Sequence, residues 1–134
     1  MNMATHTPAS SDDGSIEREI RAKGKTAPRI TPEDIEDVIA ETHYFTATDG
    51  VYGAAVVDGV ESGATAPLSL LTFCVLVLRN GFTVTGESAC ASPENFDAEI
   101  GRKIARQNAI AKVWPLEGYL LKQALYREIP KRVD

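Results

Sequence analysis

The chain has few of the side chains from which catalytic and metal sites are usually built. Its 134 residues include two histidines and two cysteines. His6 lies in a polar N-terminal segment and His43 stands alone, so a four-ligand zinc site is not expected. The sequence also has no GxSxG, HExxH, CxxC or glycine-rich phosphate-binding motif. We therefore predict a protein that is not an enzyme and uses no cofactor or metal; an enzyme would need a carboxylate base such as Glu87, Glu99 or Glu117.

A long apolar run is absent too. No stretch of 18 apolar residues occurs and the N-terminus is polar, so neither a transmembrane helix nor a signal peptide is predicted. Cys74 and Cys90 are expected to be free thiols in a reducing compartment. The sequence thus predicts a cytosolic protein with no membrane partner.

Positive charge is scarce in the middle of the chain. Residues 30–101 contain twelve Asp or Glu and one basic residue, Arg79, whereas residues 102–134 contain eight Lys or Arg and three acidic residues. Such asymmetry steers an anionic ligand toward the C-terminal third, but it argues against a nucleic-acid duplex, which needs a broad basic surface. The alternative is that acidic and basic elements pack together within or between subunits.

The chain has the length of one domain with a modest core. Residues 1–29 are rich in Ser, Thr, Asp, Gly and Lys and are predicted to form a disordered N-terminal arm. Residues 30–128 are predicted to form a single α+β domain, and residues 129–134 a C-terminal tail. We expect a small antiparallel sheet built on a central β-hairpin and packed by a short N-terminal helix, a long helix and a C-terminal helix.

Local signals place these elements. Thr31 caps the first helix and Pro32 opens it, and the pair Trp114-Pro115 is predicted to divide the last two helices. The glycine-rich segment 47–67 is predicted to be a long loop that covers a ligand or contacts a partner. The expected elements are, in order, a helix from 32 to about 41, a strand at 43–46, the loop at 47–67, the hairpin, and helices at about 93–114 and 116–126.

The hairpin is predicted from Asn80-Gly81, which follows an apolar run and precedes an alternating segment. A two-residue turn of this type needs positive φ at both positions. It would pair Leu78 with Thr83 and Val77 with Val84. This register predicts one core face, with Leu71, Phe73, Val75, Val77, Phe82 and Val84, and one mixed face, with Thr72, Cys74, Leu76, Leu78, Thr83, Thr85 and Glu87. The mixed face is either a solvent face covered by the long loop or a dimer interface or ligand floor.

Two features of the long helix also indicate contacts. Arg102 and Arg106 are one turn apart, with Lys103 adjacent, and can hold phosphates through forked donors; alternatively, Arg102 pairs with acidic neighbours at 97 and 99. Asn108 lies on the apolar side of the helix, where a buried amide needs partners. It is expected to bind the backbone of another element or, alternatively, a ligand.

Several motifs resemble a family of small phage and prophage proteins. They are, in order, Asn80-Gly81-Phe82-x-Val84-x-Gly86-x-Ser88, Asn95-Phe96-Asp97-x-Glu99-Ile100-Gly101, Asn108-Ala109 and Trp114-Pro115-Leu116-Glu117-Gly118-Tyr119. The resemblance covers about residues 30–126 and is most distinctive over 70–121. This family includes or neighbours the first anti-Thoeris protein, a phage sponge that sequesters cyclic ADP-ribose-type immune signals without cleaving them.

The resemblance implies a non-enzymatic counter-defence protein of the host cytoplasm that binds a cyclic ADP-ribose isomer or a cyclic dinucleotide as a homodimer or a trimer of dimers. Residue chemistry then suggests Phe82 for stacking on a base and the basic cluster at 102–106 for phosphate. The candidate ligand-binding residues are Phe82, Thr83, Thr85, Glu87, Asn95, Arg102, Lys103 and Arg106. The alternative is a phage early-gene interaction module that binds a host protein through the exposed sheet face or the basic C-terminal helix.

Overall fold

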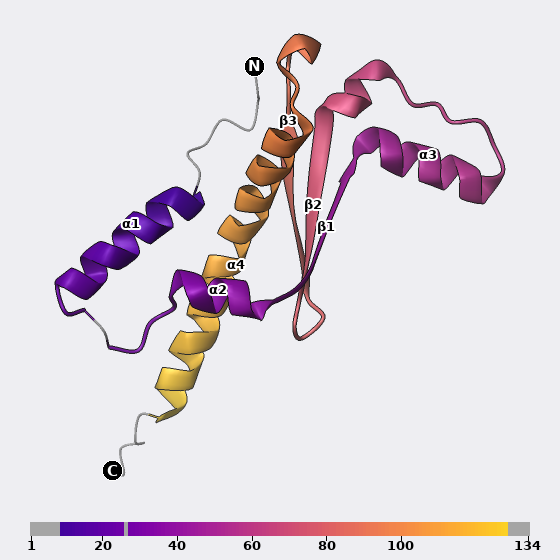
Figure 1. Ribbon diagram of the computed structural model, residues 1–134. Helices are drawn as coiled ribbons and strands as arrows, with labels where there is room; N and C mark the ends of the chain where they lie inside the picture. The colour runs from indigo at the N-terminus through magenta and orange to yellow at the C-terminus, as the bar shows by residue number, and fades with distance from the viewer. Residues whose placement is uncertain (1–8, 26, 129–134) are drawn as a thin grey trace.

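The computed structural model describes residues 9–25 and 27–128. It confirms an α+β fold whose strands form one antiparallel sheet in the order β1-β2-β3. In Figure 1, α4 runs along the strands while α3 projects from the body. The elements are α1 (Ala9–Ala22), α2 (Pro32–Val38), β1 (Ile39–Thr46), α3 (Ala47–Asp58), the 3₁₀ helix η1 (Ala66–Leu70), β2 (Leu71–Leu78), β3 (Thr83–Ala89), the 3₁₀ helix η2 (Pro93–Asn95) and α4 (Ala98–Glu128). The predicted tail at 129–134 lies outside the described residues.

The long helix α4 approaches β2 and β3 closely because the facing residues are small. A Cβ on Gly86 would lie 2.2 Å from the carbonyl oxygen of Ala105 and 2.3 Å from the nitrogen of Ala109, so only glycine fits at this position. The side chain of Asn108 donates a hydrogen bond of 2.6 Å to the backbone carbonyl of Glu87, the structural role expected for this amide. The core between helix and sheet consists of Ile35, Cys74, Leu76, Leu78, Val84, Ala105, Ala109, Ile110 and Val113.

The hairpin is present, but its predicted register is wrong by one residue. Val77 pairs with Thr83 and Leu76 with Val84. The N–H of Gly81 donates to the carbonyl of Leu78, the N–H of Leu78 donates to the carbonyl of Phe82, and Gly81 has a φ of 88°. The loop therefore has three residues and ends in a glycine bulge, rather than two residues with positive φ.

The shift exchanges the two faces of β2, because side chains alternate along a strand. The buried residues are Thr72, Cys74, Leu76 and Leu78, whereas the side chains predicted to form the core, Leu71, Phe73, Val75 and Val77, are only partly buried. On β3 the prediction is right for Val84, which is buried, but Phe82 is 54% exposed. Thr83, Thr85 and Glu87 therefore share a face with Phe73, Val75 and Val77.

The segment predicted as a loop at 47–67 contains a helix. In α3 the hydroxyl of Thr46 accepts the N–H of Asp49, and the carboxylate of Asp49 accepts the N–H of Thr46, which is a complete capping box. Gly59 ends the helix with a φ of 69°. The glycines inside the segment favour a loop, but the capping box starts a helix, so the loop prediction is wrong.

A single helix replaces the two predicted after residue 93. Pro115 lies inside α4 and cannot donate the hydrogen bond to the carbonyl of Ala111. Ala111 is exposed, so water can bind this carbonyl, and the helix continues to Glu128. The predicted break is wrong for this reason, and α4 begins at Ala98 because the residues after Ser92 form η2.

The helix α1 lies within the segment predicted to be a disordered arm. The indole nitrogen of Trp114 donates a hydrogen bond of 3.1 Å to the carboxylate of Asp13. Nη2 of Arg29 donates a hydrogen bond of 2.8 Å to the carboxylate of Glu17. The hydrogen bond from Arg29 lowers the pKa of Glu17 to about 2. The structure thus differs from the expected disorder over residues 9–22, whereas residues 1–8 lie outside its description.

Candidate functional site

A groove lies between the edge strand β1 and the first turns of α4. Because α4 packs on β2 and β3, the helix side of β1 is left partly open. The groove has a volume of about 90 Å³. We call it the arginine groove, and the residues of its lining that bear on binding are Tyr44, Phe45, Thr46, Thr72, Phe96 and Arg102.

The two predicted arginines have different surroundings. Arg106 donates two hydrogen bonds to the carboxylate of Glu36, at 3.0 and 2.7 Å. This forked contact lowers the pKa of Glu36 and raises that of Arg106. Arg106 therefore links α4 to α2, and its charge is already paired.

Arg102 has no hydrogen bond or ion pair within the part of the chain that the structure describes. The alternative in which Arg102 pairs with its acidic neighbours is not observed. The Glu99 carboxylate lies 3.3 Å from the ammonium of Lys103, and the Asp97 carboxylate accepts the N–H of Ile100. The guanidinium of Arg102 thus has five donors to offer to a ligand.

Tyr44 is a site residue that the sequence reasoning missed. Burial raises the pKa of its hydroxyl, and the charges of Arg106 and Arg102 act in the opposite direction. Both guanidinium groups are therefore close enough to interact with the hydroxyl. The available signal was alternation: Thr42, Tyr44 and Thr46 occupy the same face of β1, opposite Leu76, Cys74 and Thr72 of the covered face.

The groove also contains a carboxylate, which bears on its preference for anions. Asp49 lines the groove, but its carboxylate is bound to the N–H of Thr46 at the start of α3. Its charge is therefore held at a helix N-terminus, where it is stabilised by the helix dipole. The rings of Tyr44 and Phe96 supply flat apolar surface beside Arg102. This combination suits an anion that also carries an aromatic ring.

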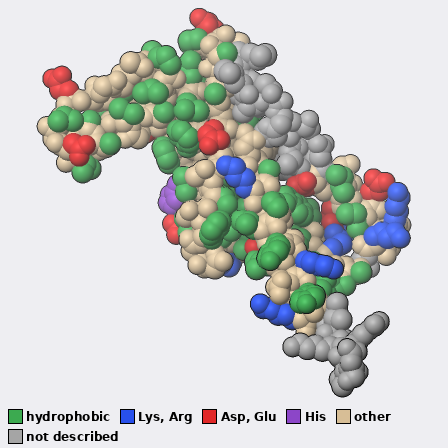
Figure 2. Space-filling view, turned by 180° about the vertical axis from the view of Figure 1, so that it is seen from behind, with side chains coloured by type: hydrophobic (Ala, Val, Ile, Leu, Met, Phe, Trp, Pro, Cys, Tyr) green, Lys and Arg blue, Asp and Glu red, His purple; other side chains and the backbone are tan. Residues whose placement is uncertain are grey.

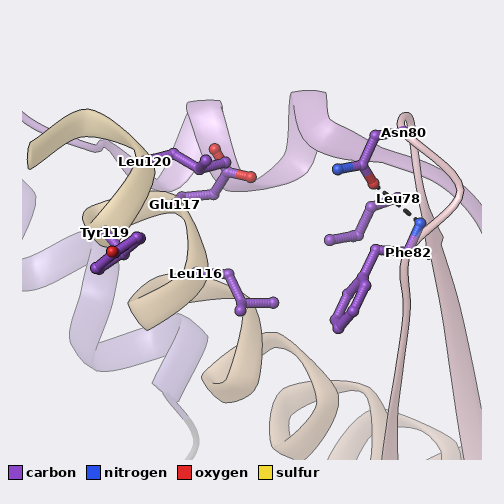
Figure 3. A pocket seen from close by; sticks show the side chains of 7 residues that line it. All are labelled: Leu78, Asn80, Phe82, Leu116, Glu117, Tyr119 and Leu120. Atoms are coloured by element: carbon purple, nitrogen blue, oxygen red, sulfur yellow. Dashed lines mark hydrogen bonds between the residues drawn. The ribbon is translucent and has the colours of Figure 1, made fainter. Parts of the chain in front are cut away.

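A second hollow lies at the hairpin turn. It has a volume of about 230 Å³ and lies between the turn and the second half of α4. In Figure 3, Leu78 and Phe82 point toward Leu116, and the Asn80 side chain accepts the N–H of Phe82. Of its seven lining residues, Glu117 alone carries a charge, so this hairpin cleft suits an apolar group better than a phosphate.

The structure does not bring the eight predicted ligand residues together within one chain. Phe82 is at the hairpin cleft, opposite Leu78, and Arg102 is at the arginine groove, beside Thr72. Thr72 and Leu78 are six positions apart on β2, which corresponds to about 20 Å along the strand. Thr83, Thr85 and Glu87 lie on the face of the sheet away from α4. Asn95 lies in η2, next to Phe96. Lys103 forms an ion pair with Glu99, and Arg106 forms one with Glu36.

The described residues form neither a metal-binding cluster nor a membrane-spanning helix. Residues 9–25 and 27–128 contain no cluster of three or more His, Cys, Asp or Glu with a geometry for metal binding. Over the same ranges, no helix has the length and apolar character needed to cross a bilayer.

The fold defines the class of this molecule: a small α+β protein whose three-stranded sheet is covered on one face by a long helix. A sequence comparison identifies the family. Residues 30–125 match the model of the phage protein (N4 Gp49/phage Sf6 gene 66) family, and the chain belongs to it. No curated protein and no solved structure matched the chain.

Proposed function

We propose that this phage protein is a counter-defence protein that binds and sequesters a cyclic nucleotide signal in the arginine groove. The observation that carries the proposal is the guanidinium of Arg102, which has no partner among the described residues and lies beside the rings of Tyr44 and Phe96. A guanidinium binds phosphate oxygens through paired N–H donors, and aromatic rings stack on bases. The resemblance to phage sponges supports the same class of ligand.

The expected ligand is a cyclic ADP-ribose isomer or a cyclic dinucleotide, because both combine phosphates with aromatic bases. The groove of about 90 Å³ is smaller than the roughly 300–1,000 Å³ of pockets that enclose such molecules. The ligand would therefore extend along β1 toward Arg106, or a second subunit would cover its remaining surface. One phosphate on Arg102 and a base on Tyr44 or Phe96 is the minimal contact set.

The state of the nearby carboxylates supports binding without cleavage. The pKa of Glu36 is lowered by its hydrogen bonds from Arg106, so Glu36 is a weak general base at neutral pH. The Asp49 carboxylate is occupied by the capping box. We therefore propose a sponge of the host cytoplasm that lowers the free concentration of its ligand and returns it unchanged.

Isothermal titration calorimetry with a panel of cyclic ADP-ribose isomers and cyclic dinucleotides tests the proposal. We expect one member of the panel to bind, and Arg102→Gln to weaken that binding at least tenfold. Lys103→Gln is the matched control, since this neighbour is exposed, pairs with Glu99 and does not line the groove. Chromatography of the ligand after incubation should recover it intact. The absence of binding heat between the wild-type protein and every member of the panel would contradict the proposal.

The alternative function is an interaction module that binds a host protein. It is favoured by exposed apolar side chains on the second half of α4, where Tyr119, Leu120 and Tyr126 are 71%, 54% and 66% exposed. This surface continues into the hairpin cleft. A pull-down from host lysate tests this function. Capture of one stoichiometric protein would support it over the first, provided that Leu120→Glu abolishes the capture and that nucleotides do not displace the captured protein.

A further inference from the structure

The hairpin cleft is larger than the arginine groove and lies apart from it. Its volume is about 230 Å³, against about 90 Å³ for the groove. An apolar cavity of about 150 Å³ is large enough for benzene, so the cleft has room for one aromatic ring with a short chain. Figure 2 shows that hydrophobic side chains are also exposed along the projecting arm of α3, where the surface is convex. The cleft differs from that arm in its hollow shape and in the single charged side chain of its lining.

The walls of the cleft are largely apolar and come from two elements. Leu78 and Phe82 flank the hairpin turn, and Leu116 and Leu120 lie one turn apart on α4. The side-chain oxygen of Asn80 accepts the N–H of Phe82 at 2.9 Å, which holds the hairpin wall in place. Phe82 and Leu120 are each 54% exposed, so a ligand can cover their apolar surface. The cleft is therefore formed before any ligand binds.

Glu117 is the charged residue of this lining, and it has no hydrogen bond or ion pair within residues 9–25 and 27–128. Its neighbours one helical turn away are Val113, Trp114, Leu120 and Leu121, so α4 supplies no basic partner at these positions. The side chain is partly buried, and Figure 3 shows it extending from α4 toward the hairpin side of the cleft. A carboxylate beside apolar walls is stabilised by a cation, because water solvates it less fully there.

We infer that the hairpin cleft is a second binding site, which takes a small organic cation with an apolar body, such as an arylalkylamine. The ammonium of this ligand pairs with the Glu117 carboxylate while its ring packs against Leu78 and Leu116. The ring of Phe82 adds attraction for the positive group, because the face of an aromatic ring is negative. The inference does not rest on the proposed function, since the cleft and the arginine groove are about 20 Å apart along β2.

Charge selects this ligand over the other occupants that an apolar cleft could accept. No Lys or Arg lines the cleft, so Glu117 would repel an anion such as a phosphate. A neutral apolar surface would cover Glu117 without pairing its charge, which costs free energy. Two copies of the chain that met symmetrically through this cleft would bring their Glu117 carboxylates together. An apolar cation matches both the walls and the carboxylate.

Nuclear magnetic resonance titration of the isotope-labelled full chain tests the inference. The probes are phenylethylamine, phenylethanol and phenylpropanoate, which share a phenylethyl group and differ in charge. The amine should produce saturable shifts of the backbone amide signals of Phe82 and Leu116. It should bind about fivefold more tightly than the neutral alcohol, because the ion pair and the contact with the ring face add to the apolar contact. The anionic compound should produce no shifts at these residues.

Glu117→Gln keeps the shape of the side chain and should bind the amine no more tightly than the wild type binds the alcohol. Glu128→Gln is the matched control and should leave the affinity for the amine unchanged, since Glu128 is the last residue of α4 and does not line the cleft. Equal affinities of the wild type for amine and alcohol would overturn the inference, as would a preference for the amine that persists in Glu117→Gln. Shifts of Phe82 and Leu116 that follow protein concentration without any probe would also overturn it, because a second copy of the chain would then cover the cleft.

Discussion

The two sides of the sheet are built on different principles. On the side covered by α4, small residues such as Gly86, Ala105 and Ala109 let the helix backbone approach the strands, and Val113 and Leu76 are fully buried. On the outer side, the valines and aromatic residues of β2 and α3 are large but are left partly or largely exposed. The covered side therefore determines stability, whereas the outer side and the groove at the β1 edge are available for contacts with other molecules.

The largest expected effect is at the closest contact of the covered side. Gly86→Ala would bring a methyl group within 2.3 Å of backbone atoms of α4, so the helix must move. We expect a loss of about 3 kcal/mol or more in the free energy of unfolding, measured with urea. The control is Gly118→Ala in α4, where no atom of another element lies within 4 Å of the new methyl group. It should raise stability by up to about 1 kcal/mol. A tolerated Gly86→Ala would show that the two sides do not differ in this way.

The buried thiol of the covered side predicts a pH dependence. Burial raises the pKa of Cys74 to about 11. An unfolded thiol loses its proton near pH 9, so between this value and pH 11 the folded state binds more protons and stability falls as pH rises. Between pH 8 and pH 11, the wild type should lose about 2 kcal/mol more than Cys74→Ala in urea unfolding. Equal losses in the two proteins would mean that the thiol is not shielded.

Helix caps give a smaller contrast between the two sides. Thr31 caps α2, which holds the buried Ile35, and Thr46 caps α3 through the same kind of capping box. Thr31→Ala should cost about 1 kcal/mol of global stability. Thr46→Ala should leave the urea midpoint almost unchanged and instead accelerate amide hydrogen exchange within α3. If Thr46→Ala destabilised the whole protein as much as Thr31→Ala, α3 would have to be part of the core.

The smallest effect separates the two arginines. Arg106→Gln removes a forked contact with Glu36 between partly exposed side chains, and should cost less than about 1 kcal/mol in urea unfolding. Arg102→Gln should cost nothing measurable, because the structure shows no partner for this side chain within the described residues. A stability loss for Arg102→Gln equal to that for Arg106→Gln would contradict its assignment to ligand binding.

Much of the fold followed from local sequence signals. The helix cap at Thr31, the hairpin at Asn80-Gly81 and the contact of Asn108 with another element's backbone were predicted correctly. The predicted register of the hairpin is wrong, because Asn-Gly fits both a two-residue turn and the last two positions of a three-residue turn. In both registers Gly86 faces α4 together with Val84; the observed pairing of Cys74 with Gly86 places the Cys74, Leu76 and Leu78 face of β2 under the helix, and no signal in the turn selects it.

The site was less predictable than the fold. Helical spacing identified Arg102 and Arg106 as neighbours, but their different pairing depends on Glu36, which is 70 residues away from Arg106 in the chain. Tyr44 and Phe96 become groove residues because α4 leaves the helix side of β1 open, and no local pattern encodes that offset. The ring of Phe82 predicts stacking on a base, but the hairpin geometry places Phe82 at the opposite end of the sheet from Arg102.

The most direct test of the account is to map a bound nucleotide on the protein by nuclear magnetic resonance. The ligand is the member of the cyclic nucleotide panel that binds, added to isotope-labelled protein while backbone amide and arginine side-chain signals are followed. We expect the largest shifts at Tyr44, Phe96 and the guanidinium of Arg102. Shifts that cluster at Phe82 and Leu116 and leave Arg102 unchanged would contradict the account, because they would place the ligand in the hairpin cleft.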